Sequence, residues 1–208
     1  MRYILFGDSI GFGVGDYQNG GWATQLRLFI DHEQKSKDHT LINLSISGDT
    51  SSGLLARMEQ EARLRMRQHN PREFTFLIAI GTNDSRINKA NLTDNISPIA
   101  FEQNIEKLIK ITQKLDVGLV LIGILPVDKT FTLPYKEEKY YQLENLWEYN
   151  QIIKNVANRF KIMFIDMYDE WLQRKDFPAL FADGLHPNTE GHKMIFEKVS
   201  SELFGNKV

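Results

Sequence analysis

Five short runs of aliphatic and aromatic residues recur along the chain, and each is followed by a longer segment of helical periodicity. The apolar runs cover residues 3–6, 41–44, 74–80, 119–125 and 162–165. Runs that are apolar at nearly every position are typical of strands buried on both faces of a parallel sheet. The segments with helical spacing cover residues 22–32, 51–68, 98–114, 140–159 and 189–203. Strand and helix alternate throughout, which predicts an α/β fold with right-handed crossovers.

The predicted helices are expected to bury one face and leave the other in water. For 22–32 the expected apolar side consists of Leu26, Leu28, Phe29 and Ile30. For 51–68 the expected apolar side consists of Leu54, Leu55, Met58, Ala62 and Met66. The polar side of this segment contains Arg57, Arg63, Arg65 and Arg67, with Glu59 and Glu61 between them. Because acidic residues intersperse this basic stripe, it is interpreted as a solvated face.

Two segments, 126–139 and 174–188, do not fit the alternation of strand and helix. Long loops inside a compact domain are usually functional or mobile. In an open parallel sheet, ligands bind outside the carboxyl ends of the strands. The residues that directly follow each predicted strand are therefore the candidates for chemistry.

Reactive residue types follow four of the predicted strands. Gly-Asp-Ser-Ile spans residues 7–10, a lone glycine after the second strand is Gly48, Gly-Thr-Asn-Asp spans 81–84, and Asp-Gly-Leu-His-Pro spans 183–187. A serine nucleophile needs a base such as His186, and the imidazole needs a carboxylate such as Asp183 to fix its tautomer. Backbone N–H groups of Ser9 and Gly48, with the Asn83 amide, would stabilise an oxyanion. The set predicts a serine acyl-transfer site.

These four blocks, in this order, resemble those of the SGNH hydrolase (GDSL esterase/lipase) superfamily over the whole chain. The resemblance implies a flavodoxin-like three-layer α/β/α sandwich with a five-stranded parallel sheet in the order 2-1-3-4-5. It also implies Ser9 as nucleophile, with Asp183 and His186 completing a catalytic triad, and Ser9, Gly48 and Asn83 as the oxyanion hole. One residue departs from the founding motif, since Ile10 stands in place of leucine.

Three neighbouring residues need a separate interpretation. His192 lies inside the predicted final helix and is expected near the surface, without a role in catalysis. Asp8 and Asp84 flank the candidate serine and asparagine, and each is interpreted as a residue that orients its loop by accepting backbone N–H bonds. Taken alone, Ser9 could be a helix N-cap and Asn83 a turn residue.

Composition limits the other classes of function. The chain has 208 residues, 42% of them hydrophobic and 25% charged, and a net charge of −2. This predicts a single domain over residues 1–208, and it argues against nucleic acid or an anionic membrane as a partner. The absence of cysteine excludes disulfides, thiolate metal sites and a cysteine nucleophile. No histidine pair has the spacing of a metal site, so no metal and no cofactor is expected.

The N-terminus and the apolar segments bear on localisation. Four apolar residues follow Arg2, too few for a signal peptide, and the stretch 117–127 is too short to span a bilayer. A cytoplasmic protein without stable membrane association is expected. The oligomeric state is left open.

The predicted function is a serine esterase or acylhydrolase that cleaves carboxylic esters or thioesters through an acyl-enzyme intermediate. Its partner is a small-molecule ester, with a small or medium acyl group. Aromatic and aliphatic residues of the two long loops are expected to wall the substrate site, namely Phe131, Leu133, Tyr135 and Phe181.

Two alternatives remain open at this point. One is a carbohydrate O-acetylesterase of the same mechanism. The other is a non-catalytic nucleotide- or flavin-binding module of flavodoxin-like fold, since Gly11, Gly13 and Gly15 invite a dinucleotide interpretation. The G-x-G-x-x-G fingerprint would require glycine at position 16, where Asp16 would place a negative charge against a pyrophosphate.

Overall fold

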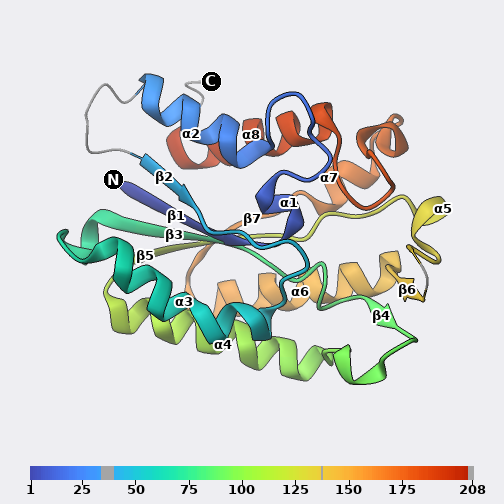
Figure 1. The fold of residues 1–208 in the computed structure, drawn as a ribbon, viewed down its shortest axis with the longest axis horizontal. Helices are drawn as coiled ribbons and strands as arrows, with labels where there is room; N and C mark the ends of the chain where they lie inside the picture. The colour runs from blue at the N-terminus through green and yellow to red at the C-terminus, as the bar shows by residue number, and fades with distance from the viewer. Residues whose placement is uncertain (34–39, 137, 206–208) are drawn as a thin grey trace.

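A five-stranded parallel sheet forms the centre of the protein, in a computed structural model that describes residues 1–33, 40–136 and 138–205 (Figure 1). The strands are β1 Arg2–Gly7, β2 Thr40–Asn43, β3 Phe74–Ala79, β5 Gly118–Ile122 and β7 Met163–Ile165. They lie in the order β2-β1-β3-β5-β7, and every pairing between them is parallel. Counted among themselves they have the order 2-1-3-4-5, which confirms the predicted topology.

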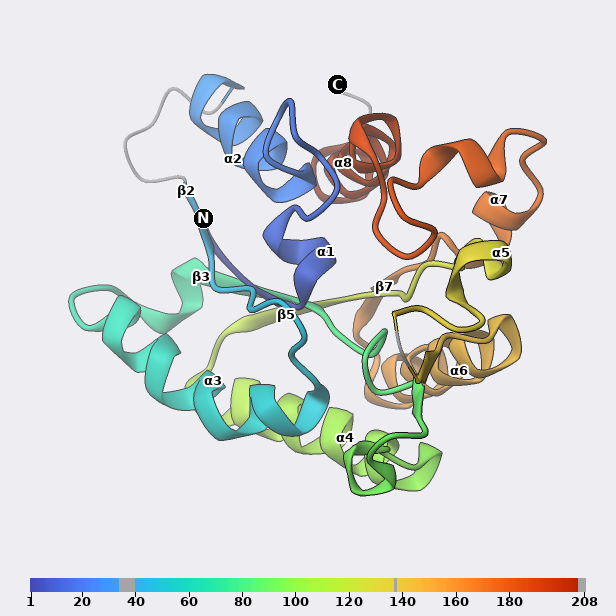
Figure 2. The ribbon, with the colours of Figure 1, turned by 45° about the vertical axis from the view of Figure 1, so that its right-hand side comes forward.

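Helices cover both faces of this sheet (Figures 1 and 2). One face is covered by α2 Trp22–Glu33 and α8 Thr189–Phe204, which bury Trp22, Leu26, Ile195 and Val199 against it. The other face is covered by α3 Ser51–Met66, α4 Pro98–Leu115 and α6 Leu143–Phe160. The predicted three-layer α/β/α sandwich is therefore confirmed.

The helices begin and end where local sequence requires it. The hydroxyl of Ser97 accepts a hydrogen bond from the backbone of Ala100, and Pro98 occupies the first turn of α4. Asp116 ends the same helix in the left-handed conformation, with φ of 56°. Thr50 caps α3 and Asn188 caps α8 in the same manner as Ser97. Each of these two caps fixes the point at which a strand-end loop joins its helix.

The long helices have one apolar and one polar face, as predicted. Leu54, Met58 and Ala62 of α3 are fully buried, but Leu28 of α2 is 57% exposed, so its assignment to the apolar side was wrong. Leu28 lies two residues from Leu26, about 200° around the helix at 3.6 residues per turn, and so points away from the sheet. None of the helices in the described part of the chain is long and apolar enough to cross a membrane.

The expectation that His192 lies near the surface was also wrong. Its side chain is fully buried, accepts a hydrogen bond at Nδ1 from the backbone of Trp22 (3.3 Å) and donates from Nε2 to the carbonyl of Val14 (3.0 Å). Burial lowers the pKa of His192 and keeps the ring neutral. His192 therefore joins α8 to the start of α2 and to the loop that follows the candidate serine.

Short elements fill the loops at the carboxyl ends of the strands. They are α1 Ser9–Phe12, α5 Lys129–Thr132, α7 Tyr168–Leu172 and the 3-10 helices η2 Leu92–Asp94 and η3 Phe177–Leu180. A further 3-10 helix, η1 Pro71–Glu73, lies at the opposite edge of the sheet, directly before β3. A separate antiparallel pair joins β4 Ile87–Asn88 to β6 Lys139–Tyr140. The two long loops of the sequence thus contain α5, β6 and η3. The pair β4–β6 was not predicted, because strands of two residues have no measurable period.

Candidate active site

The first block places a serine hydroxyl at the end of the central strand. β1 ends at Gly7 and α1 begins at Ser9, with Asp8 as the N-cap whose carboxylate accepts the N–H of Ile10 (2.9 Å). A Cβ at position 7 would lie 2.9 Å from the Oγ of Ser45 and 3.1 Å from the carbonyl oxygen of Ala79, so glycine fits here without displacing either neighbour. The interpretation of Asp8 as a loop-orienting residue agrees with this contact.

A chain of two hydrogen bonds connects Ser9 to the last block. His186 Nε2 lies 2.9 Å from Ser9 Oγ, and His186 Nδ1 lies 2.8 Å from Asp183 Oδ2. With the proton on Nδ1, the imidazole donates to the carboxylate and its Nε2 accepts from the serine hydroxyl. Ser9 and His186 are 9% and 8% exposed. This is the geometry that a general base needs in order to take the serine proton.

The Asp183 carboxylate accepts four hydrogen bonds. Its Oδ1 accepts the backbone N–H groups of Leu185 (3.1 Å) and His186 (2.8 Å). Its Oδ2 accepts His186 Nδ1–H and the hydroxyl of Tyr135 (2.9 Å). Burial alone would raise the pKa of Asp183, but the bonds from His186 and Tyr135 outweigh it and hold that pKa far below its usual range. The carboxylate is therefore charged throughout the neutral range.

A tight turn fixes the spacing between Asp183 and His186. Gly184 has φ of +86°, and a Cβ there would lie 2.6 Å from the Cβ of Phe131. The carbonyl of Gly184 accepts the N–H of Asp128 (2.8 Å), which joins this turn to the loop before α5. A left-handed glycine with a close neighbour is thus what places the two ionisable side chains three residues apart on one side of the turn.

The two other blocks bring Gly48 and Asn83 to the same hollow as Ser9 and His186. This hollow has a volume of about 310 Å³. Gly48 is exposed, has φ of +83° and has no atom within 4 Å of the place where a Cβ would stand, so its backbone is open to a ligand. Asn83 Nδ2 donates to the carbonyl of Asp49 (3.0 Å), and Asn83 Oδ1 accepts from Tyr141 (3.1 Å). These two bonds fix which side of the amide carries the donors.

Arg57 clamps the loop that carries Gly48. Its Nε and Nη2 donate to the same carboxylate oxygen of Asp49 (2.9 and 2.7 Å), and its Nη1 donates to the carbonyl of Leu44 (2.8 Å). The side chain of Arg57 is only 14% exposed. The interpretation of all four arginines as a solvated stripe was therefore wrong for Arg57, because the partners that bury it lie in the strand-end loop outside the helix.

Asp84 joins the Asn83 turn to the start of α3. Its carboxylate accepts the backbone N–H of Ser51 (3.0 and 3.1 Å to the two oxygens) and the hydroxyl of the same residue. Asn104 donates to that hydroxyl (2.9 Å) and extends the network to α4. Burial is the main cause that raises the pKa of Asp84 to about 6, and the bonds from Ser51 oppose it. Asp84 thus orients its loop by accepting a backbone N–H, as predicted.

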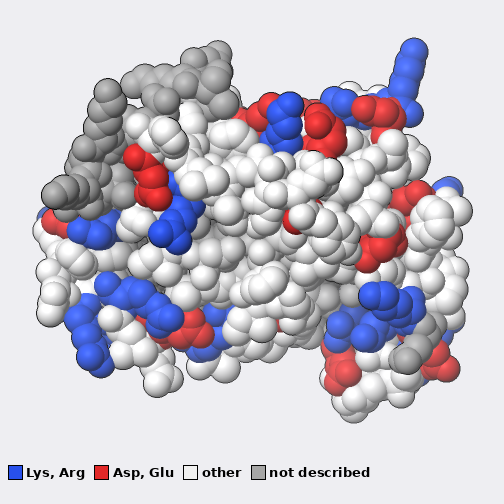
Figure 3. All heavy atoms as spheres, turned by 45° about the horizontal axis from the view of Figure 1, so that its top comes forward, with Lys and Arg blue, Asp and Glu red and all other residues white. Residues whose placement is uncertain are grey.

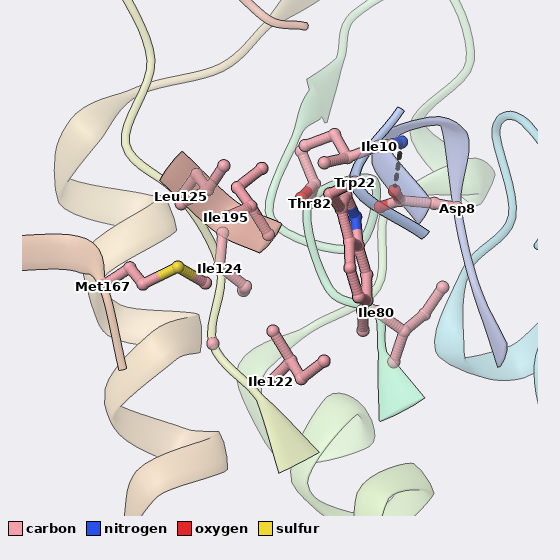
Figure 4. Close-up of a pocket in the computed structure, with 12 residues that line it drawn as sticks. Asp8, Ile10, Trp22, Ile80, Thr82, Ile122, Ile124, Leu125, Met167 and Ile195 are labelled. Carbon is pink, nitrogen blue, oxygen red and sulfur yellow. Dashed lines mark hydrogen bonds between the residues drawn. The ribbon is translucent and has the colours of Figure 1, made fainter. Parts of the chain in front are cut away.

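Asp8 and Ile10, the two neighbours of Ser9 in the sequence, border a small cavity on the side of the sheet covered by α2 and α8 (Figure 4). The cavity has a volume of about 30 Å³ and is lined mostly by apolar side chains, among them Ile80, Ile124 and Met167. Figure 4 shows the Asp8 carboxylate bonded to Ile10, next to Thr82. Burial raises the pKa of Asp8 to about 6, and the Ile10 N–H and the charge of His186 oppose this shift.

Asp8→Asn is expected to have a higher free energy of unfolding than wild type, and the difference should grow as pH rises. An acid with a raised folded-state pKa leaves stability unchanged below its unfolded pKa of about 4, and destabilises the fold once it is ionised above its folded pKa of about 6. Asparagine retains the oxygen that accepts the Ile10 N–H and carries no charge. Urea unfolding at pH 4, 6 and 8 should show an advantage that grows to roughly 2–3 kcal/mol, from two pKa units at about 1.4 kcal/mol each. A difference in the free energy of unfolding that does not change with pH would contradict the raised pKa of Asp8.

Three of the four predicted wall residues surround a second hollow beside the site. Phe131, Tyr135 and Phe181 line a space of about 430 Å³ that also borders Asp183. Leu133 is 43% exposed and does not line it. Tyr135 borders both hollows, and its ring lies edge-on to that of His186 with centroids 6.1 Å apart.

The glycines after Ser9 are explained by packing. A Cβ on Gly13 would lie 2.5 Å from the carbonyl oxygen of Gly20, and one on Gly15 would lie 2.1 Å from that of Pro187. Asp16 Oδ1 and Oδ2 accept backbone N–H groups of Gln18, Asn19 and Gly21 within the same loop. The loop thus closes on itself and on the turn after His186. Close packing therefore accounts for these glycines without a phosphate-binding role.

Residues 7–11 also fit the pattern G-x-S-x-G of the α/β-hydrolase nucleophile elbow. The pattern alone therefore does not distinguish an SGNH hydrolase from an α/β-hydrolase. The strand order and the asparagine-bearing block after β3 are the features that separate them. In the described part of the chain, no group of three or more His, Asp or Glu residues could hold a metal ion.

The fold and the Ser9–His186–Asp183 geometry define an α/β protein of serine-hydrolase type. The chain belongs to the GDSL-like lipase/acylhydrolase family, whose sequence profile matches residues 5–194. It is thus a GDSL-family esterase or acylhydrolase, as predicted from the four blocks.

Relatives of this chain align with it over nearly its whole length. An arylesterase of Vibrio mimicus is 28% identical over 203 residues, which are 97% of this chain and 88% of the relative. Esterase TesA of Pseudomonas aeruginosa is 24% identical over 197 residues, 94% of this chain and 84% of the relative. The crystal structure of the acetyl xylan esterase AlAXEase superposes with a TM-score of 0.77 at 22% identity, covering 98% of this chain and 100% of that one.

Proposed function

We propose that the protein hydrolyses carboxylic esters and thioesters through an acyl-enzyme on Ser9. The observation that carries this proposal is the 2.9 Å contact between Ser9 Oγ and His186 Nε2. In the first half-reaction, His186 takes the serine proton as Oγ attacks the acyl carbon. Asp183, fixed by its four hydrogen bonds, stabilises the imidazolium that forms. His186 then gives the proton to the departing alcohol or thiol.

Backbone N–H groups of Ser9 and Gly48 and the Asn83 amide stabilise the oxyanion of the tetrahedral intermediate. Preorganised donors of this kind need no rearrangement when the charge develops. Tyr141 holds the Asn83 oxygen away from the oxyanion, and Arg57 holds the loop of Gly48. In the second half-reaction, His186 takes a proton from the water that attacks the acyl-enzyme. It then gives this proton to Ser9 Oγ as the bond to the acyl group breaks and the acid leaves.

The dimensions of the site favour small and medium acyl groups. The hollow at Ser9 has a volume of about 310 Å³, at the lower end of the range for small-molecule sites. Its lining combines polar side chains with a larger share of apolar surface, and Tyr135 also borders the aromatic hollow of Phe131 and Phe181. An acetyl to hexanoyl group fits this space, and a palmitoyl chain would leave most of its methylenes in water.

A carbohydrate O-acetylesterase activity is the second candidate within the same mechanism. The small hollow beside Ser9, with hydrogen-bonding side chains such as Ser47 and Asn83 in its lining, suits an acetyl group on a hydroxylated alcohol. The resemblance to acetyl xylan esterases at 19–22% identity extends to the fold alone. Acetylated xylan therefore belongs in the substrate panel.

A series of p-nitrophenyl esters from acetate to palmitate tests the proposal, with acetylated xylan in parallel. We expect kcat/KM to rise up to hexanoate and to gain nothing further at laurate, because a methylene that stays in water adds none of the roughly 0.8 kcal/mol that burial contributes. The Ser9→Ala variant is the matched control. A maximum at palmitate would contradict the assignment of acyl length, and hydrolysis that persists in Ser9→Ala would contradict the mechanism.

A further inference from the structure

Among the described residues, the charged side chains that line the hollow in front of Ser9 are all basic. Arg86, Lys136 and Lys139 contribute to its lining, and no carboxylate does so among the described residues. Glu138, which directly precedes Lys139, is exposed and lies outside this lining. Figure 3 shows lysine and arginine side chains gathered at the lower right of this face, the end of the molecule where Figure 1 labels β4 and β6.

These three cations belong to the half of the described Lys and Arg side chains that have no carboxylate partner at short range. Arginines elsewhere pair with carboxylates at short range, for example Arg63 with Glu59 (2.8 Å) and Arg174 with Asp176 (2.8 Å). Within the described ranges, neither Arg86, Lys136 nor Lys139 has a carboxylate within 4.0 Å. The buried Nε–H of Arg86 also has no hydrogen-bond acceptor there. No ion pair at this distance therefore neutralises any of the three, while the neighbouring Tyr135 hydroxyl and the Asp183 carboxylate raise the pKa of Lys136.

The backbone holds the three cations together. The β4–β6 pair aligns Asn88 with Lys139, so the strand that follows Arg86 lies beside the strand that begins with Lys139. A bridge between Tyr135 and Lys139, with the N–H of Tyr135 donating to the Lys139 carbonyl (2.7 Å), closes a tight turn around Lys136. The Lys136 ammonium lies 4.9 Å from the centroid of the Tyr135 ring. This is the tyrosine whose hydroxyl binds Asp183, so the turn is attached directly to the triad.

A neutral ester makes no use of three converging cations. Cations that line a hollow with low-dielectric walls concentrate anions there and raise the association rate of anionic substrates. Arginine also binds carboxylate and phosphate groups through two parallel N–H bonds. An anionic group on the substrate would therefore be attracted to the point where its ester meets Ser9.

We infer that the substrates of this esterase are anionic esters or thioesters, whose carboxylate or phosphate is bound by Arg86, Lys136 and Lys139. This inference rests on the proposed acyl-enzyme mechanism at Ser9. It adds a substrate class to that mechanism. The anionic group belongs to the acyl part or to the leaving group, and carboxylate and phosphate share the same recognition.

Three matched substrate pairs test the inference. The acyl arm compares 4-nitrophenyl hydrogen adipate with its methyl ester, and the leaving-group arm compares 4-acetoxybenzoate with its methyl ester. The phosphate arm compares 4-acetoxyphenyl phosphate with its dimethyl ester. At 20 mM NaCl we expect kcat/KM of the anionic member to exceed that of its neutral partner by at least about tenfold in one arm, and that arm identifies the side and the anion. At 500 mM NaCl the preference should fall severalfold, because the Debye length shortens to about 4 Å.

Variants assign the preference to the three cations. In Lys136→Gln/Lys139→Gln, and separately in Arg86→Gln, the ratio of anionic to neutral kcat/KM should fall to less than about a third of the wild-type ratio. Lys107→Gln/Lys110→Gln, on the exposed face of α4, is the charge-matched control and should keep the wild-type ratio. Because each value is a ratio within one variant, a change in folded fraction cancels.

Ratios near one in all three arms of the wild type would overturn the inference, as would a wild-type ratio in both cation variants. The proposed function is tested separately by p-nitrophenyl acetate. Neutral-ester hydrolysis that depends on Ser9, without a preference for anions, rejects the substrate class alone. Hydrolysis that does not depend on Ser9 rejects the mechanism and the inference with it.

Discussion

Ser9→Ala is expected to lower kcat on p-nitrophenyl acetate by about 10⁴–10⁶-fold, the range found when the nucleophile of a serine hydrolase is removed. The physical reason is that the acyl-enzyme no longer forms and water must attack the ester directly. The Ser9 hydroxyl bonds to His186 across the site and is 9% exposed. Its removal leaves no large cavity, so the thermal midpoint should stay within a few degrees of wild type.

The nearby Ser47→Ala is the matched control for this experiment. Ser47 lines the same hollow as Ser9 but is exposed and is not bonded to His186. Its substitution should leave kcat within about threefold of wild type, which is under roughly 0.7 kcal/mol in activation free energy. A fall in kcat in Ser47→Ala equal to that in Ser9→Ala would mean that activity depends on the intact hollow and not on the Ser9 hydroxyl in particular.

Asn83→Ala is expected to lower kcat by about 10²–10³-fold with little change in KM, because the amide interacts mainly with charge that develops in the transition state. Asn83→Asp should lose at least as much, since it places a negative charge beside the developing oxyanion. Parallel measurements of kcat, KM and thermal midpoint separate this role from that of a turn residue. A turn residue would leave kcat within about threefold of wild type.

Tyr141→Phe refines the same test. The Tyr141 hydroxyl donates to Asn83 Oδ1, and its loss removes one of the two bonds that orient the amide. A smaller fall in kcat than in Asn83→Ala is expected, on the order of tenfold for one lost orienting bond. Combining Tyr141→Phe with Asn83→Ala should add little to the loss of Asn83→Ala alone, since both act through one amide. Additive losses would place Tyr141 elsewhere in the mechanism.

The layers of the fold were predictable because each element has its own local signal. The apolar run 74–80 predicted β3, and the strand ends one residue earlier, at Ala79, where the chain turns into the Asn83 block. The spacing of Leu54, Met58 and Ala62 predicted the buried face of α3. The order of the strands did not follow from these signals, because it depends on pairings between distant segments. It came from the resemblance to a known family.

The residues at the strand ends were predictable for a topological reason. Parallel strands end at the same edge of a sheet, so Ser9, Gly48 and Asn83 had to lie near one another once the sheet was assigned. The position of His186 depended on the resemblance and on the short Asp183–His186 spacing. The structure brings His186 to hydrogen-bond distance of both Ser9 and Asp183.

The supporting contacts were not predictable, because the partners lie far apart in the sequence. Tyr135 and Asp183 are 48 residues apart, and Tyr141 and Asn83 are 58 residues apart. A tyrosine in a loop carries no sequence signal that separates an apolar wall from a hydrogen-bond donor. His192 shows the same limit, since its partner Trp22 lies 170 residues away.

Covalent labelling tests the role of Ser9 most directly. A fluorophosphonate reacts with a serine activated by a neighbouring base and leaves a stable adduct of known mass. Intact mass spectrometry should show one adduct per chain, peptide mapping should place it on Ser9, and esterase activity should fall in proportion to its formation. The account predicts no adduct in Ser9→Ala or His186→Ala. An adduct on Ser47 or another serine, or full activity in protein labelled at Ser9, would contradict it.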